Sequence, residues 1–245
     1  MSAPPFIRCR GLEKAFRDKP VLRGLSLDVF AGETLVLLGG SGSGKSVILK
    51  HMNGLLRPER GEVEVDGVGL GRLDEEGLIP IRRKVSMLFQ GGALFDSLTV
   101  GENVAYALRE HHLVPVAQIP ERVAQALAMV GLGDTERLMP AELSGGMRKR
   151  AALARALVLA PRALLYDEPT TGLDPVNAAR INHLIRDVQH RLGLTSVVVT
   201  HDLASAFFVA DRIAFLHDGR IRFVGTPDEA RASTDEHLHE FLTAA

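Results

Sequence analysis

The sequence predicts an α/β fold in which a strand-containing core follows an N-terminal antiparallel β subdomain and is interrupted by an inserted α-helical subdomain. Three observations lead to this prediction. A buried apolar run enters a glycine-rich loop near residue 40, and a helical pattern starts directly after that loop. Strand-like runs occur again after residue 160. Between about residues 99 and 160 the periodicity is helical, without a convincing strand.

Apolar runs bounded by turn residues mark the strands. The predicted strands lie, in chain order, within residues 6–30 and at residues 35–38, 63–65, 85–89, 163–166, 196–200, 213–216 and 221–224. The last two flank Asp218-Gly219, a dipeptide typical of tight turns, and are expected to form a hairpin. The stretch 6–30 ends in alternating apolar residues, as a half-buried strand does.

Apolar residues at helical spacing mark the helices. The predicted helices cover residues 103–112, 122–130 and 145–159, about 18 residues between strands 163–166 and 196–200, and a short amphipathic tail from residue 230. The helix after the glycine-rich loop is expected to bury one stripe, composed of Val47, Ile48, Met52, Leu55 and Leu56. These elements predict a single domain over residues 1–245, with an α/β core and β subdomain at 1–95 and 161–228, a helical subdomain at 96–160 and a C-terminal helix at 229–245.

The composition is that of an ordinary globular protein with balanced charge. The chain has 29 basic and 30 acidic residues, so its net charge favours neither nucleic acid nor an anionic membrane surface. Cys9 is the single cysteine, which excludes an internal disulfide and fits a reducing compartment. The first six residues lack the features of a signal peptide, and no apolar run reaches about 18 residues. We therefore expect no nucleic-acid partner, and any membrane role to depend on a partner protein.

The glycine-rich loop has the sequence of a phosphate-binding P-loop. Its residues are Gly39, Gly40, Ser41, Gly42, Ser43, Gly44, Lys45 and Ser46, and Val47 follows in the helix. Glycines let consecutive backbone N–H groups surround phosphate oxygens, and the helix N-terminus adds its dipole. Lys45 is expected to reach the β- and γ-phosphates and Ser46 to ligate Mg²⁺. A flexible glycine linker is the alternative, but linkers do not follow buried strands. The sequence therefore predicts that the chain binds a nucleoside triphosphate.

Two carboxylates end the apolar strand at 163–166. Beside a P-loop, Asp167 would hold Mg²⁺ directly or through water, and Glu168 would orient and deprotonate the attacking water. The alternative is a solvated strand end before the turn at Pro169, since apolar runs often end in acids. The P-loop favours the catalytic interpretation.

A second anion site is predicted where the helix 145–159 begins. Ser144 is a good N-cap, and Gly145 and Gly146 leave exposed N–H groups directed along the helix axis. A capped helix with a glycine turn would have the same sequence, so this motif alone is weak evidence for an anion site.

Six motifs in order resemble those of ATP-binding subunits of ABC transporters. They are Gly39–Ser46, Gln90, Leu143–Gly146, Tyr166–Glu168, Gly172–Pro175 and Thr200–Asp202. The resemblance covers about residues 6–228 and implies a RecA-like P-loop NTPase core that hydrolyses ATP with Mg²⁺. It also implies that two copies pair head to tail, with ATP between the P-loop of one copy and Ser144 to Gly146 of the other. Two facing anion sites neutralise a triphosphate better than either alone.

The resemblance assigns four further residues. Gln90 would ligate Mg²⁺ and sense the γ-phosphate, and His201 would bind that phosphate and hold the attacking water. Phe16 would stack on adenine, with core packing as the alternative. Asp174 would lie at the dimer seam, although its motif could simply begin a helix.

The sequence departs from the family pattern at two positions of the loop. Many relatives carry Pro at the position of Gly40, and a second hydroxyl at the position of Val47. Gly40 costs loop entropy, and Val47 removes a possible phosphate hydrogen bond. Ser46 remains for the metal.

Two stretches, residues 87–106 and 138–142, resemble the ATPases of bacterial Mla/Mce systems, which move phospholipids between the inner and outer membranes. The resemblance implies an integral membrane permease as partner, placement at the cytoplasmic face of the inner membrane, and small regulatory and periplasmic lipid-binding subunits as further candidates. Ala93, Leu94 and Phe95 would form an apolar patch for a permease helix, or be buried. The alternatives are an ABC importer for another cargo and a non-transport ABC ATPase. The pair His111-His112 is expected at a solvated helix end.

Overall fold

The computed structural model describes residues 4–243, and residues 1–3 and 244–245 lie outside this description. The segment 1–6, where no signal peptide is expected, therefore falls partly outside the described residues. The same holds for the end of the predicted C-terminal helix 229–245.

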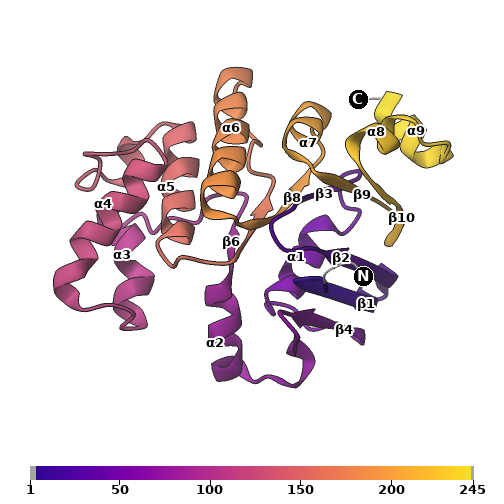
Figure 1. Cartoon of the computed structure of the whole chain (residues 1–245), viewed down its shortest axis with the longest axis horizontal. Helices are drawn as coiled ribbons and strands as arrows, with labels where there is room; N and C mark the ends of the chain where they lie inside the picture. Colours follow the sequence, from indigo (N-terminus) through magenta and orange to yellow (C-terminus); the bar gives the residue numbers. More distant parts are fainter. Residues whose placement is uncertain (1–3, 244–245) are drawn as a thin grey trace.

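Two sheets carry the strands (Figure 1). The first has the order β2-β1-β4-β5 and contains β1 (Ile7–Phe16), β2 (Lys19–Val29), β4 (Arg60–Val65) and β5 (Val68–Gly69). The second has the order β10-β9-β3-β8-β7-β6 and contains β3 (Thr34–Leu38), β6 (Val85–Leu88), β7 (Ala163–Asp167), β8 (Thr195–Thr200), β9 (Arg212–His217) and β10 (Arg220–Gly225). The first sheet is antiparallel, whereas the second is parallel from β9 to β6 and antiparallel at the β9–β10 hairpin. The predicted α/β fold with an N-terminal antiparallel sheet is confirmed.

The parallel sheet is buried on both faces, which explains its continuous apolar strands. In β3, Leu35 and Leu37 pack with the antiparallel sheet and helix α1 (Lys45–Met52), whereas Val36 and Leu38 pack with the helices on the other face. β7 and β8 alternate in the same way. The result is a layered molecule in which the ends of the central strands are held rigidly by two hydrophobic cores.

Between β6 and β7, every regular element of the described chain is helical. These elements are α3 (Val100–Glu110), η2 (Val116–Gln118), α4 (Ile119–Met129), η3 (Pro140–Glu142) and α5 (Gly145–Leu157). The remaining helical elements are η1 (Leu70–Arg72), α2 (Glu75–Lys84), α6 (Pro175–Leu192), α7 (Leu203–Val209), α8 (Pro227–Arg231) and α9 (Glu236–Thr243). In Figure 1 the helices α3, α4 and α5 form a separate layer beside α6. His111 and His112 are exposed just after α3, as expected.

Several sequence predictions about helices are corrected by the structure. The helix after the loop ends at Met52 rather than Leu56, because Gly54 adopts φ +70° and turns the chain away. Leu55 is therefore exposed instead of completing a buried stripe. The helix predicted from residue 103 begins at Val100, since Thr99 and Glu102 form a capping box.

Cys9 gives a test of the packing between the two sheets. Its side chain is fully buried in the antiparallel sheet, and this burial raises the pKa of its thiol to about 12. Because the thiolate is the reactive form, we expect the folded protein to resist a thiol reagent such as DTNB at pH 8, and the urea-unfolded chain to react with one equivalent. Absorbance at 412 nm measures both; rapid labelling of the native protein would contradict this packing.

Candidate functional site

Three segments that carry the predicted chemistry meet at one edge of the parallel sheet. The loop 39–44 follows β3, Glu168 follows β7 and His201 follows β8, and these strands are neighbours. In parallel sheets such carboxyl ends form the usual ligand crevice. A hollow of about 680 Å³ lies there, and its lining residues are Phe16, Val21, Gly40, Ser41, Gly42, Gly44, Lys45, Ser46, Val47, Gln90, Glu168, His201 and Phe241.

The start of α1 has the features of an anion site. Gly44 caps the helix with φ +106° and without a side-chain hydrogen bond, and the first turn contains no acidic residue. A side chain at Gly44 would lie 2.9 Å from Val21 Cγ1, so both the backbone and the space require glycine. The Ser43 hydroxyl is buried without a partner among the described residues. The free N–H groups and the helix dipole therefore face the hollow, which fits a bound phosphate.

Lys45 is folded back into its own loop. Its ammonium donates to the carbonyl oxygens of Gly39 at 2.7 Å and Gly40 at 2.8 Å. Burial lowers its pKa, while the Glu168 and Asp167 carboxylates act in the opposite direction. The loop thus holds a positive charge where phosphate oxygens can replace the two carbonyl acceptors.

Ser46 and Asp167 bring two oxygen groups together at the metal position. The Ser46 hydroxyl donates to Asp167 Oδ1 at 2.7 Å, and Asp167 is buried at the end of β7. Mg²⁺ prefers oxygen ligands and is commonly held by one or two carboxylates together with substrate phosphates. A hydroxyl and a carboxylate beside the phosphate loop fit this ion.

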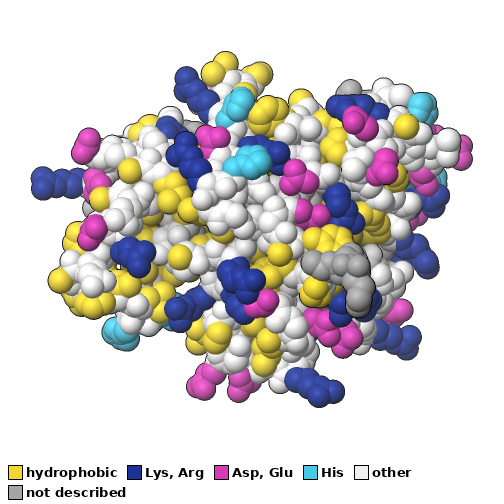
Figure 2. Space-filling model, viewed as in Figure 1, with side chains coloured by type: hydrophobic (Ala, Val, Ile, Leu, Met, Phe, Trp, Pro, Cys, Tyr) yellow, Lys and Arg dark blue, Asp and Glu magenta, His cyan; other side chains and the backbone are white. Residues whose placement is uncertain are grey.

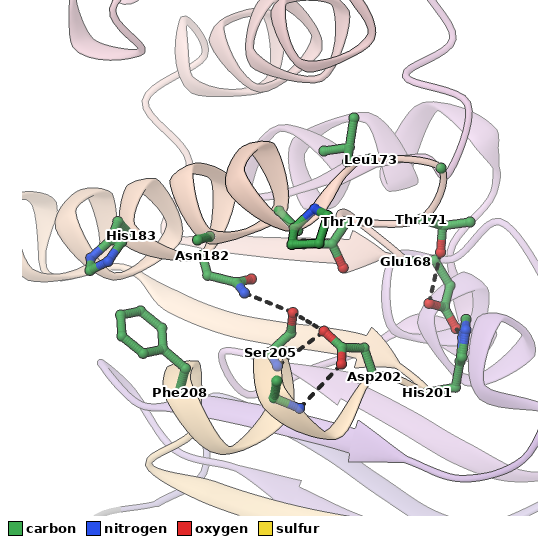
Figure 3. Close-up of a pocket in the computed structure, with 15 residues that line it drawn as sticks. Glu168, Thr170, Thr171, Leu173, Asn182, His183, His201, Asp202, Ser205 and Phe208 are labelled. Atoms are coloured by element: carbon green, nitrogen blue, oxygen red, sulfur yellow. Dashed lines mark hydrogen bonds and ion pairs between the residues drawn. The ribbon is translucent and has the colours of Figure 1, made fainter. Parts of the chain in front are cut away.

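Glu168 and His201 are in direct contact (Figure 3). Glu168 Oε1 lies 2.9 Å from His201 Nδ1, and Oε2 accepts a hydrogen bond of 3.1 Å from Thr171. The Glu168 residue is 9% exposed, and its backbone adopts φ +49°, which is strained for a non-glycine residue. The Glu168 N–H still donates to Val199 O at 3.0 Å, so the sheet supports the strained residue. A carboxylate held this way can accept a proton from water, with the imidazole beside it.

The other predicted residues of the loop side reach the same hollow. Phe16 stands at its rim, 46% exposed at the end of β1, which rules out core packing as its role. Gln90 and Val47 also line it. Asp167 is linked to the hollow through its hydrogen bond with Ser46. Gly39 lies close to β9, where an added Cβ would be 2.4 Å from the Leu216 carbonyl oxygen, so this position of the loop requires glycine.

The second predicted anion site, at the start of α5, is not part of this hollow. Ser144 caps α5 by accepting from the Met147 N–H, and Gly145 faces Leu173. Asp174 caps α6 through the N–H groups of Val176 and Asn177. Within one chain, Ser144, Gly145, Gly146 and Asp174 therefore lie outside the set of residues that line the P-loop hollow.

Two residues near the site were missed by the sequence reasoning. Lys149 on α5 is buried and donates to the Gln90 carbonyl oxygen. Its spacing from Gly146, Leu153 and Ala156 places it on the buried stripe of α5, and that pattern could have identified it. Phe241 on α9 lines the hollow and packs on Phe215, with ring centroids 5.4 Å apart. No local signal indicates where a terminal amphipathic helix docks.

Comparison with known proteins identifies a family model and several relatives that match this chain. The profile of the ABC transporter family matches residues 22–171. A Mycobacterium leprae protein described as "Probable ribonucleotide transport ATP-binding protein mkl" is 44% identical over 96% of this chain, which spans 68% of that protein. The Escherichia coli "Intermembrane phospholipid transport system ATP-binding protein MlaF" is 39% identical over 92% of this chain and 84% of its own length.

A solved structure shares the fold and the nucleotide chemistry. The dimeric ATP-binding cassette MJ0796, in a post-hydrolysis state bound to ADP and Pi, superposes with a TM-score of 0.83 at 32% identity, over 90% of this chain and 98% of that one. Its bound products are those of the reaction that the P-loop, the Ser46–Asp167 pair and the Glu168–His201 pair are suited to perform. The chain belongs to the ABC transporter family and is an ATPase that uses ATP with Mg²⁺.

Proposed function

We propose that two copies of this chain enclose two Mg-ATP molecules head to tail and drive a phospholipid permease in the inner membrane. The observation that carries the nucleotide part is the separation of the two anion sites. The P-loop hollow and the Ser144-Gly145-Gly146 end of α5 do not share a cavity within one chain. A second copy would bring its α5 terminus over the phosphates, and Asp174 would then lie at the seam. The solved relative described as a dimer supports this arrangement.

Each residue of the hollow then has a proposed role. The N–H groups of Gly39 to Val47 surround the phosphates, Lys45 leaves its loop carbonyls for the β- and γ-phosphates, and Phe16 stacks on adenine. Ser46, Asp167 and Gln90 hold Mg²⁺, which neutralises charge that develops on the phosphates. Glu168 takes the proton of the attacking water, and His201 holds that water and the γ-phosphate.

ATP contacts from both copies exist only in the closed pair, so binding favours closure and hydrolysis favours opening. We assign the sheets and their flanking segments, residues 1–95 and 161–228, to nucleotide binding. The helical segment 96–160 carries the part that touches the second nucleotide. The single helix expected over residues 229–245 is replaced in the described part of the chain by two short helices, α8 and α9.

A groove beside the helical layer supports a permease partner. It has a volume of about 280 Å³ and is lined by Arg82, Ser86, Met87, Phe89, Phe95, Tyr106, Ala107, Arg155, Ala156 and Leu159. Phe95 is 44% exposed and packs on Tyr106, with ring centroids 4.8 Å apart, whereas Leu94 is half-buried. In Figure 2, hydrophobic side chains reach the surface in the region of α2 and α3. Exposed aromatic side chains flanking a groove are suited to an amphipathic helix of a partner.

The cargo rests on the relatives' names and on the stretches 87–106 and 138–142. The MlaF relatives support phospholipids, at 39–40% identity over 84–85% of their length. The mycobacterial relative is named for ribonucleotide transport, which supports a different cargo. An ABC importer for another cargo is therefore the second candidate. No described helix is both long and apolar enough to cross a bilayer. The proposed permease would hold the chain at the cytoplasmic face of the inner membrane, with small regulatory and periplasmic lipid-binding subunits as further partners.

Co-expression with the neighbouring genes tests the permease surface. We expect a membrane protein to co-purify with the wild-type chain and to be lost with Phe95→Glu, because a charge in the groove opposes burial of the partner. The isolated Phe95→Glu protein should keep its ATPase activity. Val116→Glu is the control, since Val116 is 81% exposed outside the groove. Retention of the partner by Phe95→Glu would contradict the surface, and mass spectrometry of lipids bound to the purified assembly tests the cargo.

A further inference from the structure

The segment between β6 and α3, residues 89–99, is attached mainly to the helical layer. The buried Asn103 side chain accepts from Phe95 N–H at 2.7 Å and donates to the Phe95, Leu98 and Thr99 carbonyl oxygens at 3.0 Å each. Arg155 donates to the Gly92 and Ala93 carbonyl oxygens at 2.9 Å and 2.6 Å. These bonds attach the segment to α3 and α5.

Lys149 completes this attachment at Gln90 itself. Its ammonium donates to the Gln90 carbonyl oxygen, and the residue is 9% exposed. A buried ammonium is costly unless it is hydrogen-bonded, so the Gln90 carbonyl is a contact that the fold must keep. The Gln90 backbone is thus held by α5, and Gln90 is one of the residues that line the nucleotide hollow.

The same helix also begins with the anion-binding residues. Ser144 and Lys149 are five positions apart on α5, about 7.5 Å along a helix axis. The helix α5 therefore acts as a rigid link. Its N-terminal end, at Ser144, would touch the nucleotide of the second copy. Its Lys149 holds the carbonyl oxygen of Gln90, which lines this copy's own nucleotide hollow.

We propose that Lys149 is a positioning residue for ATP hydrolysis, which fixes Gln90 against the Ser46–Asp167 pair and transmits to it the position of α5. This inference rests on the proposed role of Gln90 at the metal. Lys149 itself touches neither nucleotide nor water in this scheme. Its loss should therefore impair turnover and the use of Mg²⁺ more than it impairs the binding of ATP.

Three variants test this proposal. Lys149→Met keeps the length and the apolar stem of the side chain but removes the ammonium, and Lys149→Arg restores a donor. Arg150→Met is the matched control, because Arg150 is the next cation on α5 and also donates to carbonyl oxygens, at Val130 and Gly131, away from Gln90. The measurements are steady-state ATPase rates against ATP and against Mg²⁺, binding of a fluorescent ATP analogue, and thermal unfolding.

We expect Lys149→Met to lower kcat by about ten-fold or more, because a displacement of about 1 Å in a positioned group can cost up to about 10²-fold in rate. The variant should also need more Mg²⁺ for half-maximal rate. KM for ATP and analogue binding should stay near wild type, and Lys149→Arg should recover most of the rate. Arg150→Met should lower the melting temperature without this loss of kcat.

An unchanged kcat and Mg²⁺ dependence in Lys149→Met would overturn the proposal. An equal loss of kcat in Arg150→Met, or no recovery in Lys149→Arg, would also overturn it, since either would indicate a general effect on α5. The Glu168→Gln variant separates this outcome from failure of the proposed active site. If Glu168→Gln is inactive while Lys149→Met is fully active, only the role of Lys149 is wrong.

Discussion

Replacing Glu168 by Gln should lower ATP turnover by about 10²–10⁴-fold while leaving nucleotide binding intact. The amide has the same shape, so the contacts with Thr171 and His201 keep a partner, but it cannot accept a proton from water. Because products no longer form, ATP should hold the two copies together. Phosphate release measures the first effect, and size-exclusion chromatography with Mg-ATP measures the second.

Glu62→Gln is the control for the removal of one carboxylate, since Glu62 is exposed on β4, on the sheet that does not carry the catalytic pair. It should turn over ATP at the wild-type rate. Normal turnover by Glu168→Gln would remove Glu168 from the role of base. Loss of analogue binding in that variant would instead mean that the substitution had damaged the hollow.

Replacing Lys45 by Ala should reduce nucleotide binding below detection. The ammonium is the positive charge held at the centre of the loop, and charge-assisted hydrogen bonds to phosphate are among the strongest that a protein forms. The protein has no tryptophan, so binding is best followed through the fluorescence of a labelled ATP.

Lys50→Ala serves as the control for Lys45→Ala, because Lys50 lies in the last turn of the same helix and does not line the hollow. It should bind the labelled ATP as the wild type does. If Lys45→Ala bound the labelled ATP as tightly as the wild type does, the backbone N–H groups would suffice for binding. That result would contradict the central role of the ammonium.

The sequence places the P-loop, Glu168 and His201 at strand ends, as the structure does, because these signals are local. A buried strand, a glycine loop and a helix start within a few residues of one another around Lys45. Glu168 and His201 each follow a short apolar strand, and such strands expose their following residues at one edge of a parallel sheet. The strand order that makes β7 and β8 neighbours depends on contacts between distant parts of the chain, so spacing alone could not provide it.

The missed features depend on tertiary contacts. No periodic pattern in the sequence predicts α2, which contains Pro80 and buries only Leu78 and Ile81, or the seven-residue α7. Both helices are stabilised by packing and caps rather than by a long periodic pattern. Lys149 was missed because a lysine within a basic run is normally solvated. Its helical spacing could have placed it on the buried stripe of α5, but its hydrogen bond to the Gln90 carbonyl oxygen depends on the fold.

The position of α9, the last described helix, couples ligand binding in the hollow to the C-terminal part of the chain. Phe241 contributes to the wall that faces Phe16 and Lys45, and it is anchored on Phe215 of β9. Any ligand that gains contact with this ring must stabilise the docked terminus by the same free energy that the docked terminus adds to ligand affinity. Undocking of α9 should therefore weaken nucleotide binding, and nucleotide binding should favour the docked α9. A molecule that binds α9 would change the affinity of the hollow for ATP.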